Sequence, residues 1–120
     1  MDCIFCKIIN GDIPCYKLFE NENVLVFLDI NPASPGHLLV VPKKHTLDFE
    51  SISNNELISV LEVAKDMIKL LTEKLNASGY TLIQNNGIAQ DVKHFHLHII
   101  PKYSKKITLS IEEVHNLLTK

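Results

Sequence analysis

The sequence predicts an α+β fold built on an antiparallel β-sheet, and three observations support this class. Short apolar stretches rich in β-branched residues are separated by short polar turns, which is typical of antiparallel strands. The stretch that follows Ser53 has apolar residues at three- and four-residue spacing, which indicates a long amphipathic helix set apart from the strands. The 120 residues, 46% of them hydrophobic, suffice for a single domain over residues 1–120 with a core of its own.

In the first half of the chain the pattern predicts a short helix followed by three strands. Two prolines and a glycine in residues 31–36 exclude regular strand pairing there, so this segment is predicted to be a loop. Pro42 is expected to stop the third strand. The predicted elements are a helix capped by Asp2 and reaching about Ile9, a hairpin of Lys17–Phe19 and Val24–Leu28, and a strand over His37–Val41.

In the second half the pattern predicts two helices that flank the last two strands. Ser53-x-x-Glu56 has the form of a capping box, and the helix that it opens is expected to run for about five turns until Gly79. Its predicted apolar face consists of Leu57, Leu61, Ala64, Ile68, Leu71 and Leu75. The remaining elements are strands over Tyr80–Gln84 and His94–Ile100 and a short C-terminal helix opened by Ser110-x-x-Glu113.

Charge and composition exclude several classes of partner. The net charge is −2, too mild an imbalance for a nucleic-acid-binding face. All 12 cationic residues are lysines, so any phosphate must be held by lysine, histidine, hydroxyl, amide or backbone N–H groups rather than by a guanidinium fork. No apolar run approaches the roughly 20 residues of a bilayer span, and the first dozen residues lack a signal-peptide pattern. We therefore expect a cytoplasmic protein that binds neither nucleic acid nor membranes.

Three histidines alternate with apolar residues over residues 94–100, which read His-Phe-His-Leu-His-Ile-Ile. On a strand, side chains alternate between faces, so His94, His96 and His98 share one face, and the apolar residues between them lie under the long helix. The alternative is three solvated imidazoles on an open face. One metal bound by these three alone would require the strand to bend, because their nitrogens point apart. A row of imidazoles suits chemistry on a phosphate, since a neutral ring can attack phosphorus while neighbours donate hydrogen bonds.

This pattern, with apolar residues between and after the histidines, resembles the motif of the histidine triad (HIT) superfamily of nucleotide hydrolases and transferases. The resemblance covers nearly the whole chain and is nearest to the Hint branch, the histidine triad nucleotide-binding proteins. It implies a HIT-like fold, with a five-stranded antiparallel sheet, one long helix and short N- and C-terminal helices. It also implies a homodimer joined through the long helix and an edge strand. The segments that carry it are Ile4-Phe5, Lys7-Ile8-Ile9, Phe27-Leu28-Asp29-Ile30, Pro35-Gly36-His37, Pro42-Lys43-Lys44-His45, Asn85-Asn86-Gly87 and the triad with Pro101.

The resemblance also implies roles for individual residues. His96 corresponds to the nucleophile that forms a covalent nucleotidyl-histidine, His98 to the residue that hydrogen-bonds the phosphate and the bridging atom, and His37 to a fourth histidine that supports the nucleophile. Asp29 corresponds to the acid that receives the ribose hydroxyls, although it could instead only form the turn before Asn31. The other implied substrate-binding residues are Ile4, Phe5, Ile8, Phe27 and Ile30 around the base, for which ordinary core packing is the alternative, and Asn85 and Gln90 near the phosphate.

The loop before the triad departs from the family pattern at two positions. Ala89 stands where a glycine N–H usually approaches the phosphate, and Asp91 replaces the hydroxyl residue of some members. A carboxylate repels a phosphate, so the contacts that this loop makes with the substrate stay open.

The cysteines indicate a metal site. Three cysteines do not form a disulfide framework, and Cys3-x-x-Cys6 is half of a metal site or a redox pair. Zinc needs two more ligands, for which His45 and His94 are the candidates. Several bacterial histidine triad proteins hold zinc with these four positions, so the resemblance implies one structural zinc, with no catalytic metal. The alternative is a pair of free thiols beside a histidine that only forms hydrogen bonds. Cys15 has no predicted partner, and His115 is expected to be solvated.

The function implied by the resemblance is hydrolysis of nucleoside 5′-phosphoramidates, or of related purine nucleotide conjugates, to a nucleoside monophosphate. Two alternatives stay open at this point. The chain could hydrolyse dinucleoside polyphosphates by the same chemistry with a different leaving group. It could also be a nucleotide-binding or protein-interaction module whose turnover is incidental, although retention of both His96 and His98 favours an enzyme.

Overall fold

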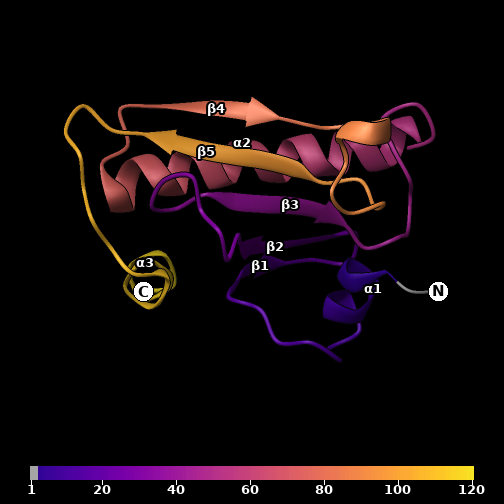
Figure 1. The fold of residues 1–120 in the computed structure, drawn as a ribbon, viewed down its shortest axis with the longest axis horizontal. Coiled ribbons are helices and arrows are strands. Elements are labelled where there is room, and N and C mark those ends of the chain that lie inside the picture. Colours follow the sequence, from indigo (N-terminus) through magenta and orange to yellow (C-terminus); the bar gives the residue numbers. More distant parts are fainter. Residues whose placement is uncertain (1–2) are drawn as a thin grey trace.

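The computed structural model describes residues 3–120 and contains a five-stranded antiparallel sheet with a long helix against one face (Figure 1). The strand order is β1-β2-β3-β5-β4, so β1 and β4 are the edges of the sheet. The α+β prediction with a five-stranded antiparallel sheet is therefore confirmed. The elements are α1 (Ile4–Ile9), β1 (Lys17–Glu20), β2 (Val24–Leu28), β3 (Leu38–Pro42), α2 (Asn54–Leu75), β4 (Gly79–Ile83), the 3₁₀ turn η1 (Gly87–Ala89), β5 (Leu97–Lys102) and α3 (Ile111–Leu118).

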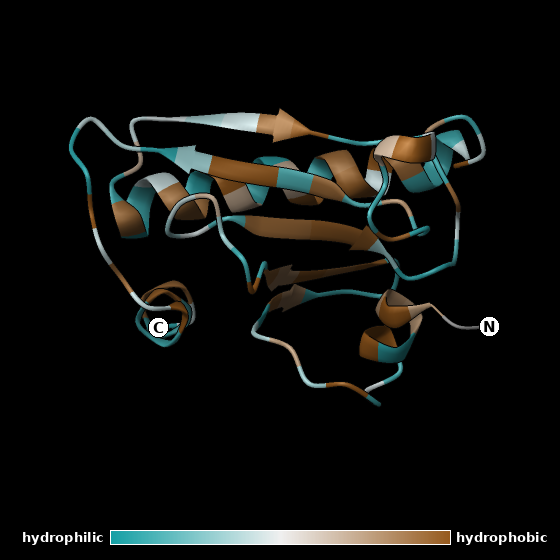
Figure 2. Cartoon of the chain, viewed as in Figure 1, coloured by the Kyte–Doolittle hydropathy of each residue, from teal (hydrophilic) through white to brown (hydrophobic). Residues whose placement is uncertain are grey.

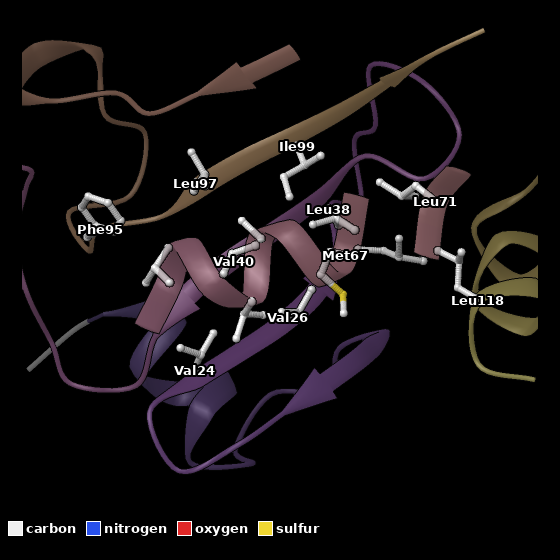
Figure 3. Packing of buried hydrophobic residues seen from close by; sticks show 14 of the residues in the cluster. Val24, Val26, Leu38, Val40, Met67, Leu71, Phe95, Leu97, Ile99 and Leu118 are labelled. Carbon is white, nitrogen blue, oxygen red and sulfur yellow. The ribbon is translucent and has the colours of Figure 1, made fainter. Parts of the chain in front are cut away.

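The central strands are buried on both faces, because different elements cover each side of the sheet. Val24, Val26 and Leu28 of β2 belong to the core beneath α2. Figure 3 shows Val24 and Val26 in this core together with residues of β3 and β5. Leu25 and Phe27 point to the opposite face, where they pack with Cys3 and Phe5 at the start of the chain. Figure 2 accordingly shows β2 and β3 as hydrophobic along their length. The face opposite α2 is therefore covered only in part by α1, which leaves room for a cavity.

Five of the six residues that the spacing placed on the core face of the long helix are buried or partly buried there, and Leu61 is the exception. Leu61 is 45% exposed, whereas Val60 is fully buried. The predicted stripe was too narrow, because apolar residues occupy a wide arc of this helix and only packing against the sheet decides which part of the arc is buried. The buried residues of α2 are Val60, Val63, Ala64, Met67, Leu71 and Leu75.

Both helix starts predicted in the second half of the chain are confirmed, but only the second has a complete capping box. The Ser53 hydroxyl accepts the Glu56 N–H at 3.1 Å, and Ser110 with Glu113 forms a reciprocal capping box at α3. The long helix ends at Asn76, not at Gly79 as predicted, because Asn76 adopts the left-handed conformation with φ of 61° and closes the helix itself. Gly79 instead begins β4.

At the N-terminus the first helix begins at Ile4 with Cys3 as its cap, and the predicted cap, Asp2, lies outside the described residues. The prediction that Pro42 stops the third strand is wrong by one residue, because Pro42 pairs with Val24 as the last residue of β3. His115 is half-buried rather than solvated: its Nε2 lies 2.9 Å from the Lys17 carbonyl oxygen and joins α3 to β1.

The histidine segment alternates as predicted, but its strand starts later. β5 begins at Leu97 rather than His94, because the Phe95 N–H donates to the Thr46 carbonyl at 2.7 Å instead of to a neighbouring strand. The apolar residues of the segment lie in the core beneath α2, and His94 and His96 are buried on the other face. The residues on the α2 side are Phe95, Leu97 and Ile99.

None of the helices within residues 3–120 combines the length and apolarity that a membrane crossing demands.

Candidate active site and metal centre

A cavity of about 260 Å³ opens on the face of the sheet opposite α2. It lies between α1, the end of β2 and the histidine segment. Eight of the predicted substrate or catalytic residues line it together: Ile4, Phe5, Ile8, Phe27, Asp29, Ile30, His96 and His98. Leu28 also lines the cavity, from a segment that carries the resemblance but without a predicted role. The other residues that sequence reasoning missed carry no motif and reach the cavity only through the fold: Ile13, Pro14, Cys15, Leu39 and Val92.

His96 is held in one tautomer at the wall of this cavity. Its Nδ1 lies 2.8 Å from the carbonyl oxygen of His94, and a carbonyl can only accept a hydrogen bond. Nδ1 therefore carries the proton, which leaves the lone pair of a neutral ring on Nε2. The ring is 4% exposed and meets the ring of Phe5 edge-on, with 4.9 Å between centroids. A buried, oriented imidazole with a free Nε2 lone pair can act as a nucleophile.

A second hydrogen-bonded chain sets the tautomer of His98. The Ala33 N–H donates to His37 Nδ1 at 3.0 Å, so His37 carries its proton on Nε2. That nitrogen lies 2.9 Å from His98 Nδ1 and 3.5 Å from Asp29 Oδ2. His98 Nδ1 accepts this proton's hydrogen bond, so His98 carries its own proton on Nε2 and can donate it to a ligand.

His37 and His98 are both neutral at neutral pH. Burial lowers the pKa of His37. Burial, with the neighbouring rings of His96 and His37, lowers the pKa of His98 to about 4. The structure brings His37 to His98, whereas the resemblance paired it with the nucleophile. The Asp29, His37 and His98 donor atoms are close enough together for a metal ion, but the proton that Ala33 forces onto His37 Nε2 occupies the lone pair that a metal would need.

The loop that carries Ala33 and His37 is held against the rest of the fold at two points. Gly36 has a φ of 92°, and a Cβ added there would lie 2.8 Å from the Leu75 side chain. Glycine is therefore required both by the backbone conformation and by the close approach to α2. The Ser34 hydroxyl donates to the Pro101 carbonyl at 2.6 Å, which ties the loop to β5. These contacts explain why a loop can hold His37 in register with His98.

Asp29 stabilises the turn at Asn31 and also lines the cavity. Its Oδ1 accepts the Asn31 N–H at 2.9 Å, which forms the turn that the sequence offered as an alternative role. Its Oδ2 lies toward His37 and His98, and the side chain is 20% exposed at the cavity wall. The two roles are compatible, because each uses a different carboxylate oxygen.

Asn85 and Gln90 do not line this cavity. The Gln90 side chain is buried, and its Nε2 donates to the Leu47 carbonyl at 2.7 Å, so this amide holds two loops together. Asn85 is half-buried, and its carbonyl accepts a hydrogen bond from the Gln84 side chain. Asp91 of the same loop does line the cavity, beside His96 and His98.

Cys3, Cys6, His45 and His94 meet at a second site, as the sequence predicted, with one ligand atom of each within 4.8 Å of all the others. Sγ–Nδ1 distances are 3.4 Å from Cys3 to His94, 3.3 Å from Cys6 to His45 and 3.6 Å from Cys6 to His94. Tetrahedral zinc with ordinary bond lengths separates sulfur and nitrogen ligands by about 3.5 Å. These three sulfur–nitrogen separations match those of tetrahedral zinc, and two thiols with two imidazoles are a donor set that zinc prefers.

His94 connects this second site to His96. Its Nε2 lies 2.8 Å from the Pro42 carbonyl oxygen, which places the proton on Nε2 and leaves Nδ1 as the ligand atom. Burial lowers the pKa of His94, which keeps the ring neutral as metal binding requires. Its own carbonyl accepts the His96 Nδ1 proton. The residue that would anchor a metal therefore also orients the ring at the cavity.

Comparisons with known proteins agree with this geometry. An uncharacterized HIT-like protein of Methanocaldococcus jannaschii is 50% identical over 103 residues, which cover 84% of this chain and 79% of the relative. The adenosine 5′-monophosphoramidase of Schizosaccharomyces pombe is 44% identical over 113 residues, covering 92% of this chain and 82% of that enzyme.

Among solved structures, a zinc-bound histidine triad family protein from Mycobacterium smegmatis superposes with a TM-score of 0.92 at 35% identity, covering 99% of this chain and 91% of that one. The family model described as the HIT domain matches residues 10–105. Because this match includes the triad and spans most of the chain, the protein belongs to the histidine triad family.

Proposed function

We propose that this protein hydrolyses nucleoside 5′-phosphoramidates, or related nucleotide conjugates, to a nucleoside monophosphate. The observation that carries the proposal is the buried His96 ring, whose Nδ1 proton is bound by the His94 carbonyl at 2.8 Å while the ring lines an apolar cavity that also contains Asp29. An apolar cavity with a few polar groups at one end suits a nucleotide whose base is buried and whose phosphate meets those groups. The named activity of the fission yeast relative supports the same class of substrate.

The proposed reaction has two steps. His96 Nε2 attacks the α-phosphorus, a nitrogen–phosphorus bond forms to the ring, and the phosphorus–nitrogen bond of the substrate breaks as the leaving amine takes up one proton from solvent. Water then attacks the same phosphorus, the bond to His96 breaks, and one proton is released with the nucleoside monophosphate. The His98 ring is neutral at pH 7, since its pKa is lowered to about 4, and its one proton is on Nε2 because Nδ1 accepts the hydrogen bond from His37. His98 Nε2 therefore donates a hydrogen bond to the phosphate oxygens in both steps.

A turnover assay tests this function. The purified protein is incubated with adenosine 5′-phosphoramidate and, separately, with a dinucleoside polyphosphate, and AMP release is measured. We expect faster release from the phosphoramidate. Faster release from the polyphosphate would assign the other hydrolase activity, and no release from either would leave a nucleotide-binding module.

Asp29→Asn is expected to weaken binding of ribonucleotides more than binding of 2′-deoxyribonucleotides. The carboxylate can accept charge-assisted hydrogen bonds from both ribose hydroxyls, and the deoxy ligand already lacks one of them. Titration calorimetry with AMP and dAMP measures the difference, for which we expect about a tenfold loss for AMP and a smaller one for dAMP. Equal losses for the two ligands would show that Asp29 acts only on the turn at Asn31.

We further propose that Cys3, Cys6, His45 and His94 hold one structural zinc ion. Four protein ligands leave no open position for water or substrate, so the ion would supply no chemistry of its own to the reaction. It would instead join α1 to the segments that carry His45 and His94. The sulfur–nitrogen distances of 3.3 to 3.6 Å support this proposal, as does the zinc-bound relative from Mycobacterium smegmatis.

We also propose a homodimer that pairs the free edge of β4 with a second copy. β4 is an edge strand, and Leu82 and Ile83 on it are 47% and 38% exposed. An unprotected apolar edge strand favours pairing with another chain. Leu82→Lys should shift the protein toward monomer in light scattering after gel filtration, whereas Leu117→Lys on α3 should leave the mass unchanged. A wild-type protein that elutes as a monomer would contradict the proposal.

A further inference from the structure

A separate cavity, of about 620 Å³, lies between the loop of residues 31–36 and the segment that joins β5 to α3. Figure 1 shows this segment at the end of the sheet away from α1. Two hydrogen bonds fix the two walls against each other. The Ser34 hydroxyl donates to the Pro101 carbonyl at 2.6 Å, and the Tyr103 hydroxyl donates to the Pro35 carbonyl at 2.5 Å. This preformed cavity shares no lining residue with the nucleotide cavity, so the proposed hydrolysis does not use it.

The charged residues that line this cavity are all lysines. Lys102 is the last residue of β5, and Lys105 and Lys106 lie on the segment after it. All three are exposed, and across residues 3–120 none of them has a carboxylate within 4.0 Å. The chain as a whole has 14 acidic residues against 12 lysines, so a cavity wall with three lysines and no acid is a local reversal of charge. We call it the lysine cavity.

Backbone donors are also free on this side of the fold. In the part of the chain that the structure describes, no backbone N–H of residues 104–109 donates to a backbone carbonyl. Thr108, which is exposed, adds a hydroxyl to the cavity wall. Lysine ammonium groups, hydroxyls and backbone N–H groups are the donors that bind phosphate oxygens in a chain without arginine. The lysine cavity therefore combines positive charge with the hydrogen-bond donors that a phosphate needs.

We propose that the lysine cavity binds an oligophosphate, meaning a chain of three or more phosphates, through Lys102, Lys105 and Lys106. The three cations lie within residues 102–106 and face one concave site, which suits a compact and densely charged anion. A phosphate chain carries a charge on every phosphate. An acidic peptide is the sparser anion, because side chains on one side of an extended segment lie about 6.5–7 Å apart. The proposal does not depend on the proposed hydrolysis, because it uses a different cavity.

Titration calorimetry with tripolyphosphate in about 0.1 M salt tests the proposal. Each lysine that pairs with a phosphate charge about 4 Å away contributes roughly fivefold in affinity, so Lys105→Gln with Lys106→Gln should weaken binding about 20-fold or more. Binding by the wild-type protein should also weaken as salt is added, because the lysines are exposed.

Lys44→Gln with Lys65→Gln is the matched control. It removes the same charge from two exposed lysines that do not line the cavity. Tripolyphosphate affinity should stay within about twofold in this control, because charges more than about 10 Å away are screened at this salt concentration. AMP affinity should be unchanged in both double variants, since none of the four lysines lines the nucleotide cavity.

The possible outcomes separate this proposal from other sites and other ligands. Unchanged tripolyphosphate affinity in Lys105→Gln with Lys106→Gln would overturn the proposal and place the anion elsewhere, as would an equal loss in the control. Equal wild-type affinity for orthophosphate and tripolyphosphate, or tighter binding of a pentaglutamate peptide, would overturn the assignment of an oligophosphate. Absence of phosphoramidate turnover would overturn the proposed hydrolysis alone, because tripolyphosphate binding is measured without it.

Discussion

His96→Ala should reduce turnover of a nucleoside phosphoramidate by on the order of 10³-fold or more, while nucleotide affinity stays within about tenfold. The variant loses the only protein atom proposed to form a bond with phosphorus, but it retains Asp29, His98 and the apolar wall that would hold the nucleotide. The loss should therefore appear in kcat rather than in the dissociation constant. Steady-state kinetics with calorimetric titration of AMP measures both quantities.

His115→Ala is the matched control, because His115 lies at the contact of α3 with β1, away from the cavity. It should retain near wild-type kcat. Rapid quenching of a single turnover with phosphorus-labelled substrate should trap label on wild-type protein and none on His96→Ala. A His96→Ala variant that retains more than a few per cent of the wild-type rate would assign the nucleophile to another residue.

Cys3→Ser with Cys6→Ser should abolish zinc binding and lower the melting temperature by about 10 °C or more. Metal that binds the folded state adds its binding energy to folding, and a loss of about 3 kcal/mol produces a shift of that size in a chain of this length. Zinc would connect α1 to His45 and to His94 in the folded protein. Metal analysis by mass spectrometry and thermal unfolding with and without added zinc measure the two effects.

Cys15→Ser is the control for the loss of a thiol, since Cys15 lines the nucleotide cavity and is not part of the metal cluster. It should retain one zinc per chain. In the double variant, turnover by the folded fraction should fall only moderately, because His94 still supplies the backbone carbonyl that orients His96. Full zinc occupancy in the double variant would contradict the structural site and would favour a metal held by the triad itself.

Local sequence patterns predicted most of the helices and strands, and they predicted which residues of the histidine segment point into the core. Alternation of apolar residues placed Phe95, Leu97 and Ile99 in the core, and the capping box at Ser110 gave the start of α3, because both depend on neighbours within a few residues. The face of α2 was predicted less well. Leu61 has the right spacing but is 45% exposed, since the sheet and not the helix decides which part of a wide apolar arc is covered.

The sequence by itself determined the class of fold and, through the motif it resembles, the family and the four residues that meet at the metal site. The class of fold is encoded by residue type and by short spacing, which a strand or helix converts directly into geometry. The metal site joins residues that lie 39 and 91 positions apart, so the motif resemblance and not local spacing predicted it. Only the tertiary structure decided that His37 contacts His98, that Gln90 holds a loop and that Asp91 lines the nucleotide cavity. These facts depend on where loops far apart in the chain come together, and loop paths follow from packing rather than from the periodicity of the residues within them.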